Sequence, residues 1–64
     1  MEDATALKER IKKLQGLTVK LKLDLHDLTE ELPVGWETIP DVAARCHQAY
    51  FDLAQARAEL ASAS

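Results

Sequence analysis

A strict four-three repeat of apolar residues in the first half of the chain constrains its fold more than any other feature. The repeat has eight positions, seven of them strongly apolar: Leu7, Ile11, Leu14, Thr18, Leu21, Leu25, Leu28 and Leu32. This spacing places apolar side chains along one stripe of a helix, as in coiled coils and helical bundles. Asp3 or Thr5 can serve as the N-cap. Pro33 and Gly35 end the pattern, so we expect a helix over about residues 5–31, roughly 40 Å long.

Thr18 interrupts this apolar stripe with a hydroxyl group. It is either a polar layer that fixes the register of helix packing or a methyl-bearing residue that is tolerated where helices approach closely. We favour the second interpretation, because threonine can return its hydroxyl to a carbonyl of the preceding helical turn.

A second four-three repeat follows the turn. Its six positions are Val42, Cys46, Ala49, Leu53, Ala56 and Leu60. Thr38 suits the N-cap, and Asp41 places a carboxylate near the helix N-terminus, which predicts a helix over about residues 38–61. The alternation of alanine with leucine lets two backbones approach closely without leaving voids. Three further residues widen the apolar face: Ile39, Ala43 and Tyr50.

The linker from Leu32 to Glu37 is too short for any arrangement except an antiparallel hairpin. A hairpin alone leaves each apolar stripe half covered, and chains below roughly 70 residues rarely gain enough stability from one core. The single cysteine, Cys46, excludes a disulfide within the chain, and one cysteine with two histidines does not suit a closed zinc site. We therefore expect an all-α fold, with one helical-hairpin domain over residues 1–64 that dimerises into a four-helix bundle. Residues 1–4 and 61–64 are expected to fray.

Charge is divided along the hairpin. Basic residues lie on the first two-thirds of the first helix: Lys8, Arg10, Lys12, Lys13, Lys20 and Lys22. Six carboxylates then follow with no lysine or arginine among them: Asp24, Asp27, Glu30, Glu31, Glu37 and Asp41. Loop ends placed together would repel each other, so the charges favour a homodimer with its two loops at opposite ends.

The same composition speaks against several partners. The net charge is −3, the lysines do not form one stripe, and no aromatic residues alternate with them, which argues against nucleic-acid binding. No apolar run is long enough to span a bilayer, and the N-terminus lacks the pattern of a signal peptide, so we expect a cytoplasmic protein.

A histidine and several carboxylates lie on the outward face of the first helix. His26, Asp27 and Glu30 are candidate ligands for a divalent transition metal such as Ni, Fe or Zn. Because the neighbouring leucines face the core, we favour a solvated acidic face over a metal site. Val19 and Leu23 share this outer face and form a modest apolar patch that suits docking.

Trp36, the only tryptophan, lies in the loop, where it either caps the open end of the bundle or anchors a partner. Cys46 belongs to the core stripe, and His47 lies on another face, so the pair does not form a nucleophile and its base. A two-helix hairpin has no cleft and no oxyanion donors. We therefore expect no enzymatic activity.

Three segments together resemble a known family. They are Leu-Lys-x-x-Ile-Lys-Lys-Leu, then Asp24-Leu25-His26-Asp27-Leu28-x-Glu30-x-Leu32-Pro33, and then Trp36-Glu37-x-Ile39-Pro40-x-Val42-Ala43. Over about residues 7–60 the chain resembles the small Rop-like proteins encoded in nitrogen-fixation gene clusters. The resemblance implies two antiparallel helices that pair into a rod-like, Rop-like four-helix bundle.

The resemblance also implies an accessory role in nitrogen fixation. The family signature falls on Asp24, His26, Asp27, Glu30, Leu32, Pro33, Trp36, Glu37 and Pro40, which gather at the loop end. The main hypothesis is an adaptor or protective factor that binds a nitrogenase component or a cofactor-maturation protein. A small metal-binding protein for cofactor assembly is the alternative, and Rop-like RNA binding is a weaker one, since similarity of fold does not transfer function.

Overall fold

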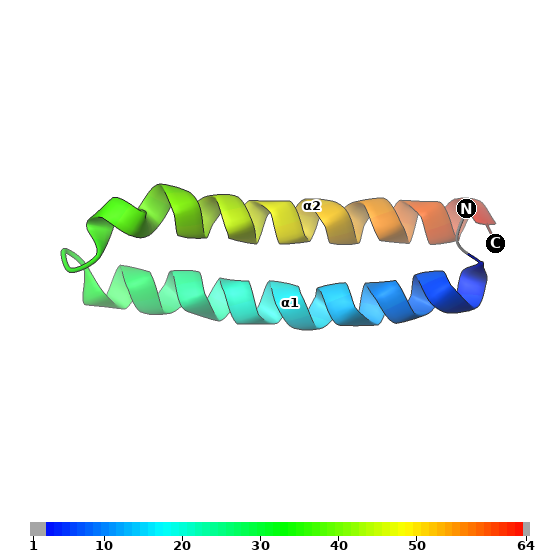
Figure 1. The fold of residues 1–64 in the computed structure, drawn as a ribbon, viewed down its shortest axis with the longest axis horizontal. Coiled ribbons are helices and arrows are strands. Elements are labelled where there is room, and N and C mark those ends of the chain that lie inside the picture. Colours follow the sequence, from blue (N-terminus) through cyan, green and yellow to red (C-terminus); the bar gives the residue numbers. More distant parts are fainter. Residues whose placement is uncertain (1–2, 64) are drawn as a thin grey trace.

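The described part of the chain, residues 3–63 of a computed structural model, consists of helices and one short connection. Helix α1 spans Ala4–Glu31, the 3₁₀ helix η1 spans Trp36–Thr38, and helix α2 spans Ile39–Ala63. The two long helices run antiparallel, with the connection at one end and both termini at the other (Figure 1). The molecule is a rod of 46 × 15 × 13 Å. This confirms the predicted all-α hairpin.

The helices are slightly longer than the sequence predicts. Helix α1 begins at Ala4 rather than Thr5, and α2 continues to Ala63 rather than 61. Part of each terminus that is expected to fray, namely residues 1, 2 and 64, lies outside the described residues.

Asp3 is the N-cap of α1. Its Oδ1 accepts a hydrogen bond of 2.8 Å from the Ala6 amide, and its carbonyl accepts one of 3.0 Å from the Leu7 amide. A side-chain oxygen at this position satisfies an amide that has no partner within the helix. Of the two candidates, Asp3 rather than Thr5 is therefore the N-cap.

The connection between α1 and α2 is built from successive tight turns. Gly35 has a φ of 79°, in the left-handed region that glycine adopts without steric cost, and the Leu32–Pro33 peptide bond is cis. Three backbone hydrogen bonds define the turns: the Val34 amide to the Glu31 carbonyl at 3.0 Å, the Trp36 amide to the Pro33 carbonyl at 3.3 Å, and the Thr38 amide to the Gly35 carbonyl at 2.9 Å.

Thr38 does not cap α2 in the expected way. It lies directly before the helix, as the sequence predicts, but its hydroxyl donates a 2.7 Å hydrogen bond to the Gly35 carbonyl. The physical reason is the 3₁₀ turn that precedes α2. The Ile39 amide donates to the Trp36 carbonyl, so the 3₁₀ turn runs directly into α2 and Thr38 lies inside a continuous run of helical turns.

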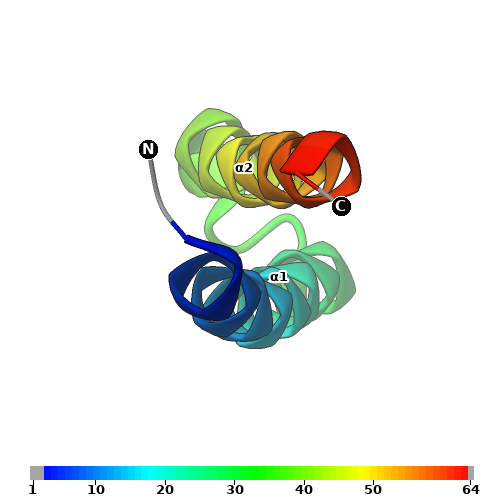
Figure 2. The same cartoon turned by 90° about the vertical axis from the view of Figure 1, so that its right-hand side faces the viewer.

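The core lies in the seam where the two helices face each other. The buried apolar residues are Leu7, Ala49, Leu53 and Ala56. Eight further residues expected in the seam are half-buried: Ile11, Leu14, Leu21, Leu25, Leu28, Val42, Cys46 and Leu60. Leu32, the last position of the first repeat, follows the end of α1 and is exposed. The end-on view in Figure 2 shows only the two helices, with no third described element over either flank of the seam.

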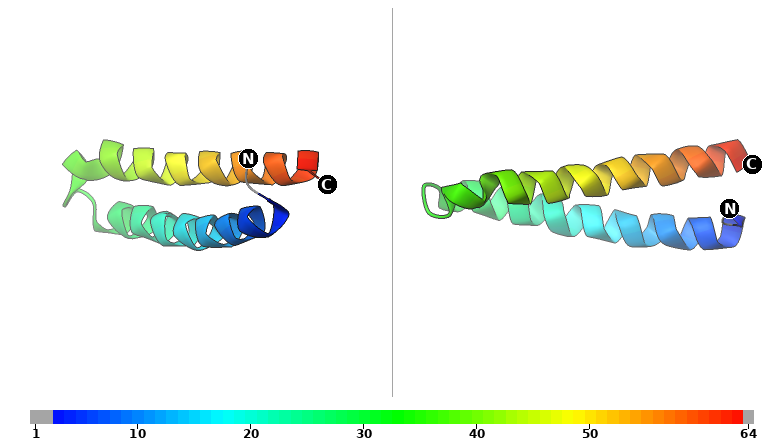
Figure 3. Two further views of the ribbon diagram at one scale, coloured as in Figure 1. Left: turned by 45° about the vertical axis from the view of Figure 1, so that its right-hand side comes forward. Right: turned by 45° about the horizontal axis from the view of Figure 1, so that its top comes forward.

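Thr18 is buried in this seam and is 4% exposed. Its hydroxyl donates a 2.8 Å hydrogen bond to the Gln15 carbonyl, one turn earlier in the same helix. The hydroxyl is therefore satisfied locally, as the interpretation of a tolerated threonine requires. Figure 3 shows that the helices cross at a shallow angle and lie close together along the rod.

Candidate functional site

Among the residues that the structure describes, the two most exposed large apolar side chains lie in the connection between the helices. We call residues 31–38 the tip. Within it, Val34 is 70% exposed and Trp36 is 60% exposed. Trp36 is thus largely in solvent rather than packed over the end of the seam. Because an exposed tryptophan beside another apolar side chain is typical of binding surfaces, the tip is the principal candidate site.

Carboxylates surround the tip, and most of them have partners within the hairpin. Lys20 Nζ lies 3.2 Å from Asp24 Oδ2. Arg45 Nε lies 3.3 Å from Asp41 Oδ2. These pairs are one helical turn apart and exposed, so each contributes little to stability.

His26 contacts two further carboxylates. Its Nδ1 lies 3.6 Å from Asp27 Oδ1, and its Nε2 lies 3.4 Å from Glu30 Oε1, so both are ion pairs when the imidazole is protonated. Among the described residues, the side chains of Glu31 and Glu37 make no ion pair or hydrogen bond. The tip therefore carries the two carboxylates that remain available to a partner.

The same geometry bears on metal binding. Asp27 and Glu30 approach opposite nitrogens of the His26 ring, so the three side chains do not converge on one point. Within the described part of the chain, no three histidine, cysteine, aspartate or glutamate side chains are grouped so that they could hold a metal ion. The structure places His26 between the two carboxylates as a local polar cluster on the surface of α1.

The outer face of α1 forms a separate surface. Val19 and Leu23 are 57% and 55% exposed, and His26 and Glu30 continue the same face toward the loop. Of the residues expected to bind a partner, Val19, Leu23, Asp24, His26, Asp27 and Glu30 belong to α1, whereas Leu32, Pro33, Trp36 and Glu37 belong to the tip. The structure thus divides the expected surface into two parts.

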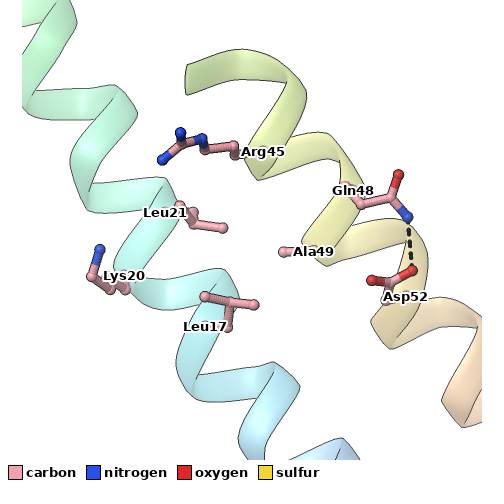
Figure 4. A pocket seen from close by; sticks show the side chains of 7 residues that line it. All are labelled: Leu17, Lys20, Leu21, Arg45, Gln48, Ala49 and Asp52. Atoms are coloured by element: carbon pink, nitrogen blue, oxygen red, sulfur yellow. Dashed lines mark hydrogen bonds between the residues drawn. The ribbon is translucent and has the colours of Figure 1, made fainter. Parts of the chain in front are cut away.

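An open groove runs beside the seam near the middle of the rod. It has a volume of about 380 Å³ and is lined by Leu17, Lys20, Leu21, Arg45, Gln48, Ala49 and Asp52. Leu17 and Leu21 extend from α1 toward Ala49 on α2, and Gln48 Nε2 donates a 2.8 Å hydrogen bond to Asp52 Oδ1 at the rim (Figure 4). The lining contains no serine, cysteine or histidine.

Within residues 3–63, five exposed large apolar residues are not among the expected site residues: Leu17, Val34, Ile39, Tyr50 and Phe51. The sequence assigns Ile39 and Tyr50 to a wider apolar face of the second helix, and in the structure they are 37% and 45% exposed. Val34 lies between Pro33 and Gly35, and side chains in such tight surface turns are exposed. The sequence therefore contains the signal that Val34 is exposed. Leu17 precedes a seam position by one residue, and Phe51 lies midway between two seam positions, so helical periodicity places both off the seam.

Comparison with known proteins identifies the family. The sequence profile of the Rop-like family matches residues 2–64. The chain belongs to the Rop-like family. It is 52% identical over 52 residues to a Frankia alni protein named for its place in the nifX-nifW intergenic region. The matched segment covers 81% of this chain and 63% of that protein. It thus spans just under two thirds of that relative's length.

Two other relatives match over most of their own length. A UPF0437 protein of Azorhizobium caulinodans is 42% identical over 60 residues, which is 94% of this Rop-like chain and 87% of the relative. One of Sinorhizobium fredii is 42% identical over 62 residues, 97% of this chain and 92% of the relative. No solved structure matches the chain significantly. None of the helices in the described range 3–63 combines the length and apolar character needed to cross a bilayer.

Proposed function

We propose that this Rop-like protein is a non-enzymatic accessory factor of nitrogen fixation. In this proposal its acidic loop end binds a nitrogenase component or a cofactor-maturation protein. The name of the Frankia alni relative, which places it between nifX and nifW, supports the link to nitrogen fixation. The observation that carries the binding role is the exposed tip, where Val34 and Trp36 stand beside unpaired carboxylates.

The proposal includes a homodimer with its two loops at opposite ends. A core with four buried apolar residues, two of them alanines, is small for an independently stable domain. Eight half-buried seam residues still have an open side, and a second hairpin is the simplest partner that matches them. With both loops together, the loop-end carboxylates of the two hairpins would repel each other, and the arrangement with the loops at opposite ends avoids this repulsion.

Direct binding to purified proteins tests the function. The chain is immobilised through its N-terminus, away from the tip, and exposed to each purified nitrogenase component protein and each purified cofactor-maturation protein. We expect one of them to bind with a dissociation constant in or below the micromolar range, as is typical of transient protein complexes. If no protein in this set binds at concentrations well above micromolar, the proposed function is wrong.

Metal supply and RNA binding remain alternatives without a supporting observation in the described residues. The candidate metal ligands His26, Asp27 and Glu30 do not converge on one point. The charged residues of the tip are carboxylates, whereas RNA binding requires cations. The proposal therefore rests on protein binding.

A further inference from the structure

We infer that the tip binds an apolar pocket whose rim carries lysine or arginine side chains on the partner protein. Val34 and Trp36 enter the pocket, and Glu31 and Glu37 pair with the cations at its rim. This inference rests on the proposed function, because it describes the partner surface that the loop end fits.

The apolar part of the inference comes from exposure. Val34 and Trp36 are more exposed than any other large apolar side chain in the described residues, and they are two positions apart in one compact turn. Exposed apolar area in water is costly, and tryptophan in particular tends to dominate the energy of protein interfaces. A projecting pair of this kind fits a concave apolar surface better than a flat one.

The charged part comes from the distribution of ion pairs. No lysine or arginine occurs between Leu23 and Ala44, so the chain supplies no cation to the tip except His26. His26 already contacts Asp27 and Glu30. Lys20 of α1 contacts Asp24, and Arg45 of α2 contacts Asp41. Glu31 and Glu37 are the two carboxylates left over, and they flank the apolar pair in sequence. Charge complementarity therefore points to cations on the partner.

The tip is also held in shape before it binds. Its three turns are closed by backbone hydrogen bonds of 2.9 to 3.3 Å, and Gly35 packs against Leu28 of α1. A surface that is already ordered avoids much of the entropy that a flexible loop loses on binding. An anionic lipid surface is the wrong partner for this tip, because it repels unpaired carboxylates.

Two exposed apolar residues away from the tip lack this combination. Phe51 is 50% exposed on the outer face of α2, but its nearest carboxylate in sequence, Asp52, accepts a hydrogen bond from Gln48. Val19 is next to Lys20, whose ammonium group is paired with Asp24. Phe51 therefore serves as a matched control for Trp36.

Four variants test the inference against the purified protein that binds wild type. Trp36→Ala removes the larger apolar side chain, and the double variant Glu31→Gln with Glu37→Gln removes the two carboxylates without changing their size. Phe51→Ala is the control for loss of an exposed aromatic ring. The double variant Glu9→Gln with Glu59→Gln removes the same total charge from residues outside the tip, and with it the exposed 3.9 Å ion pair between Arg10 and Glu59, which contributes little to stability.

We expect Trp36→Ala to weaken binding about tenfold or more, the size of a hot-spot loss. The Glu31 and Glu37 double variant should weaken binding at low salt and flatten the dependence of affinity on salt, because exposed ion pairs are screened. Both controls should bind like wild type. Circular dichroism should show unchanged helix content and melting for all four, because each altered side chain is exposed.

The outcomes separate this inference from the proposed function. If wild type binds and both tip variants bind equally well, the inference is wrong and the proposed function stands with another contact surface. If the charge variant alone behaves like wild type, the cationic rim is wrong. If wild type binds none of the purified proteins, the proposed function fails, and the inference fails with it.

Discussion

Gly35 lies directly against Leu28 at the turn between the helices. A methyl group at the Cβ position of residue 35 would lie 3.2 Å from Leu28 Cδ1, and the φ of Gly35 is +79°. Gly35→Ala therefore meets both a left-handed backbone and a close contact. We expect it to lower the free energy of unfolding by about 1 to 2 kcal/mol, measured by urea denaturation at fixed protein concentration.

Gly16 provides the matched control with the opposite sign. It lies within α1, and no atom lies within 4 Å of its Cβ position. Gly16→Ala should raise the free energy of unfolding by about 0.5 to 1 kcal/mol, because alanine loses less backbone entropy in a helix. Equal effects of the two substitutions would contradict the described turn.

Ala56 is buried in the seam between the helices. It is 0% exposed, so Ala56→Leu forces three additional carbon atoms into a filled seam. We expect a loss of about 1 to 3 kcal/mol of unfolding free energy. Ala58→Leu, two residues along the same helix and exposed, should leave stability nearly unchanged. Thermal melts of both variants would show whether α2 faces α1 as described.

The proposed dimer predicts a distance between its two loop ends. A spin label at Val34→Cys, in a Cys46→Ala background, marks each exposed tip. With the loops at opposite ends, electron–electron dipolar spectroscopy should give a separation comparable with the 46 Å length of the hairpin. A separation well below half this length would support both loops at one end. A monomer in sedimentation, with a melting temperature independent of protein concentration, would exclude the dimer.

Metal titration tests the ion-pair interpretation of His26. Because Asp27 and Glu30 approach opposite ring nitrogens, we expect calorimetry with Ni²⁺, Zn²⁺ or Fe²⁺ to show no micromolar binding that depends on His26. The comparison is His26→Ala against His47→Ala, which alters the other histidine of the chain. Micromolar binding that only His26→Ala removes would restore the metal-binding alternative.

The sequence predicts the two long helices and the seam between them well. Four-three spacing depends only on helical geometry, so it identifies which residues of α1 and α2 face each other. Thr18 follows the same rule, because its hydroxyl finds a partner one turn away in its own helix. The sequence limits the N-cap of α1 to Asp3 or Thr5. It does not decide between them, because each side chain has an oxygen that can accept a hydrogen bond from a backbone amide.

The tip is harder to predict from the sequence, because its structure depends on tight turns rather than on a four-three repeat. The sequence indicates that Pro33 and Gly35 end the helix, but it does not show that a 3₁₀ turn would precede α2 and redirect the hydroxyl of Thr38. It also does not show which carboxylates are paired. His26 has four carboxylates within five residues of it in the chain, and only the side-chain conformations select Asp27 and Glu30.

The three turns of the tip are closed by main-chain hydrogen bonds, and the hydroxyl of Thr38 adds one more to the Gly35 carbonyl. None of these bonds uses the side chains at positions 34 and 36, which are largely exposed. Evolution can exchange those two residues without disturbing the rod behind them. Hairpins of this kind can diverge in what they recognise while their architecture stays the same.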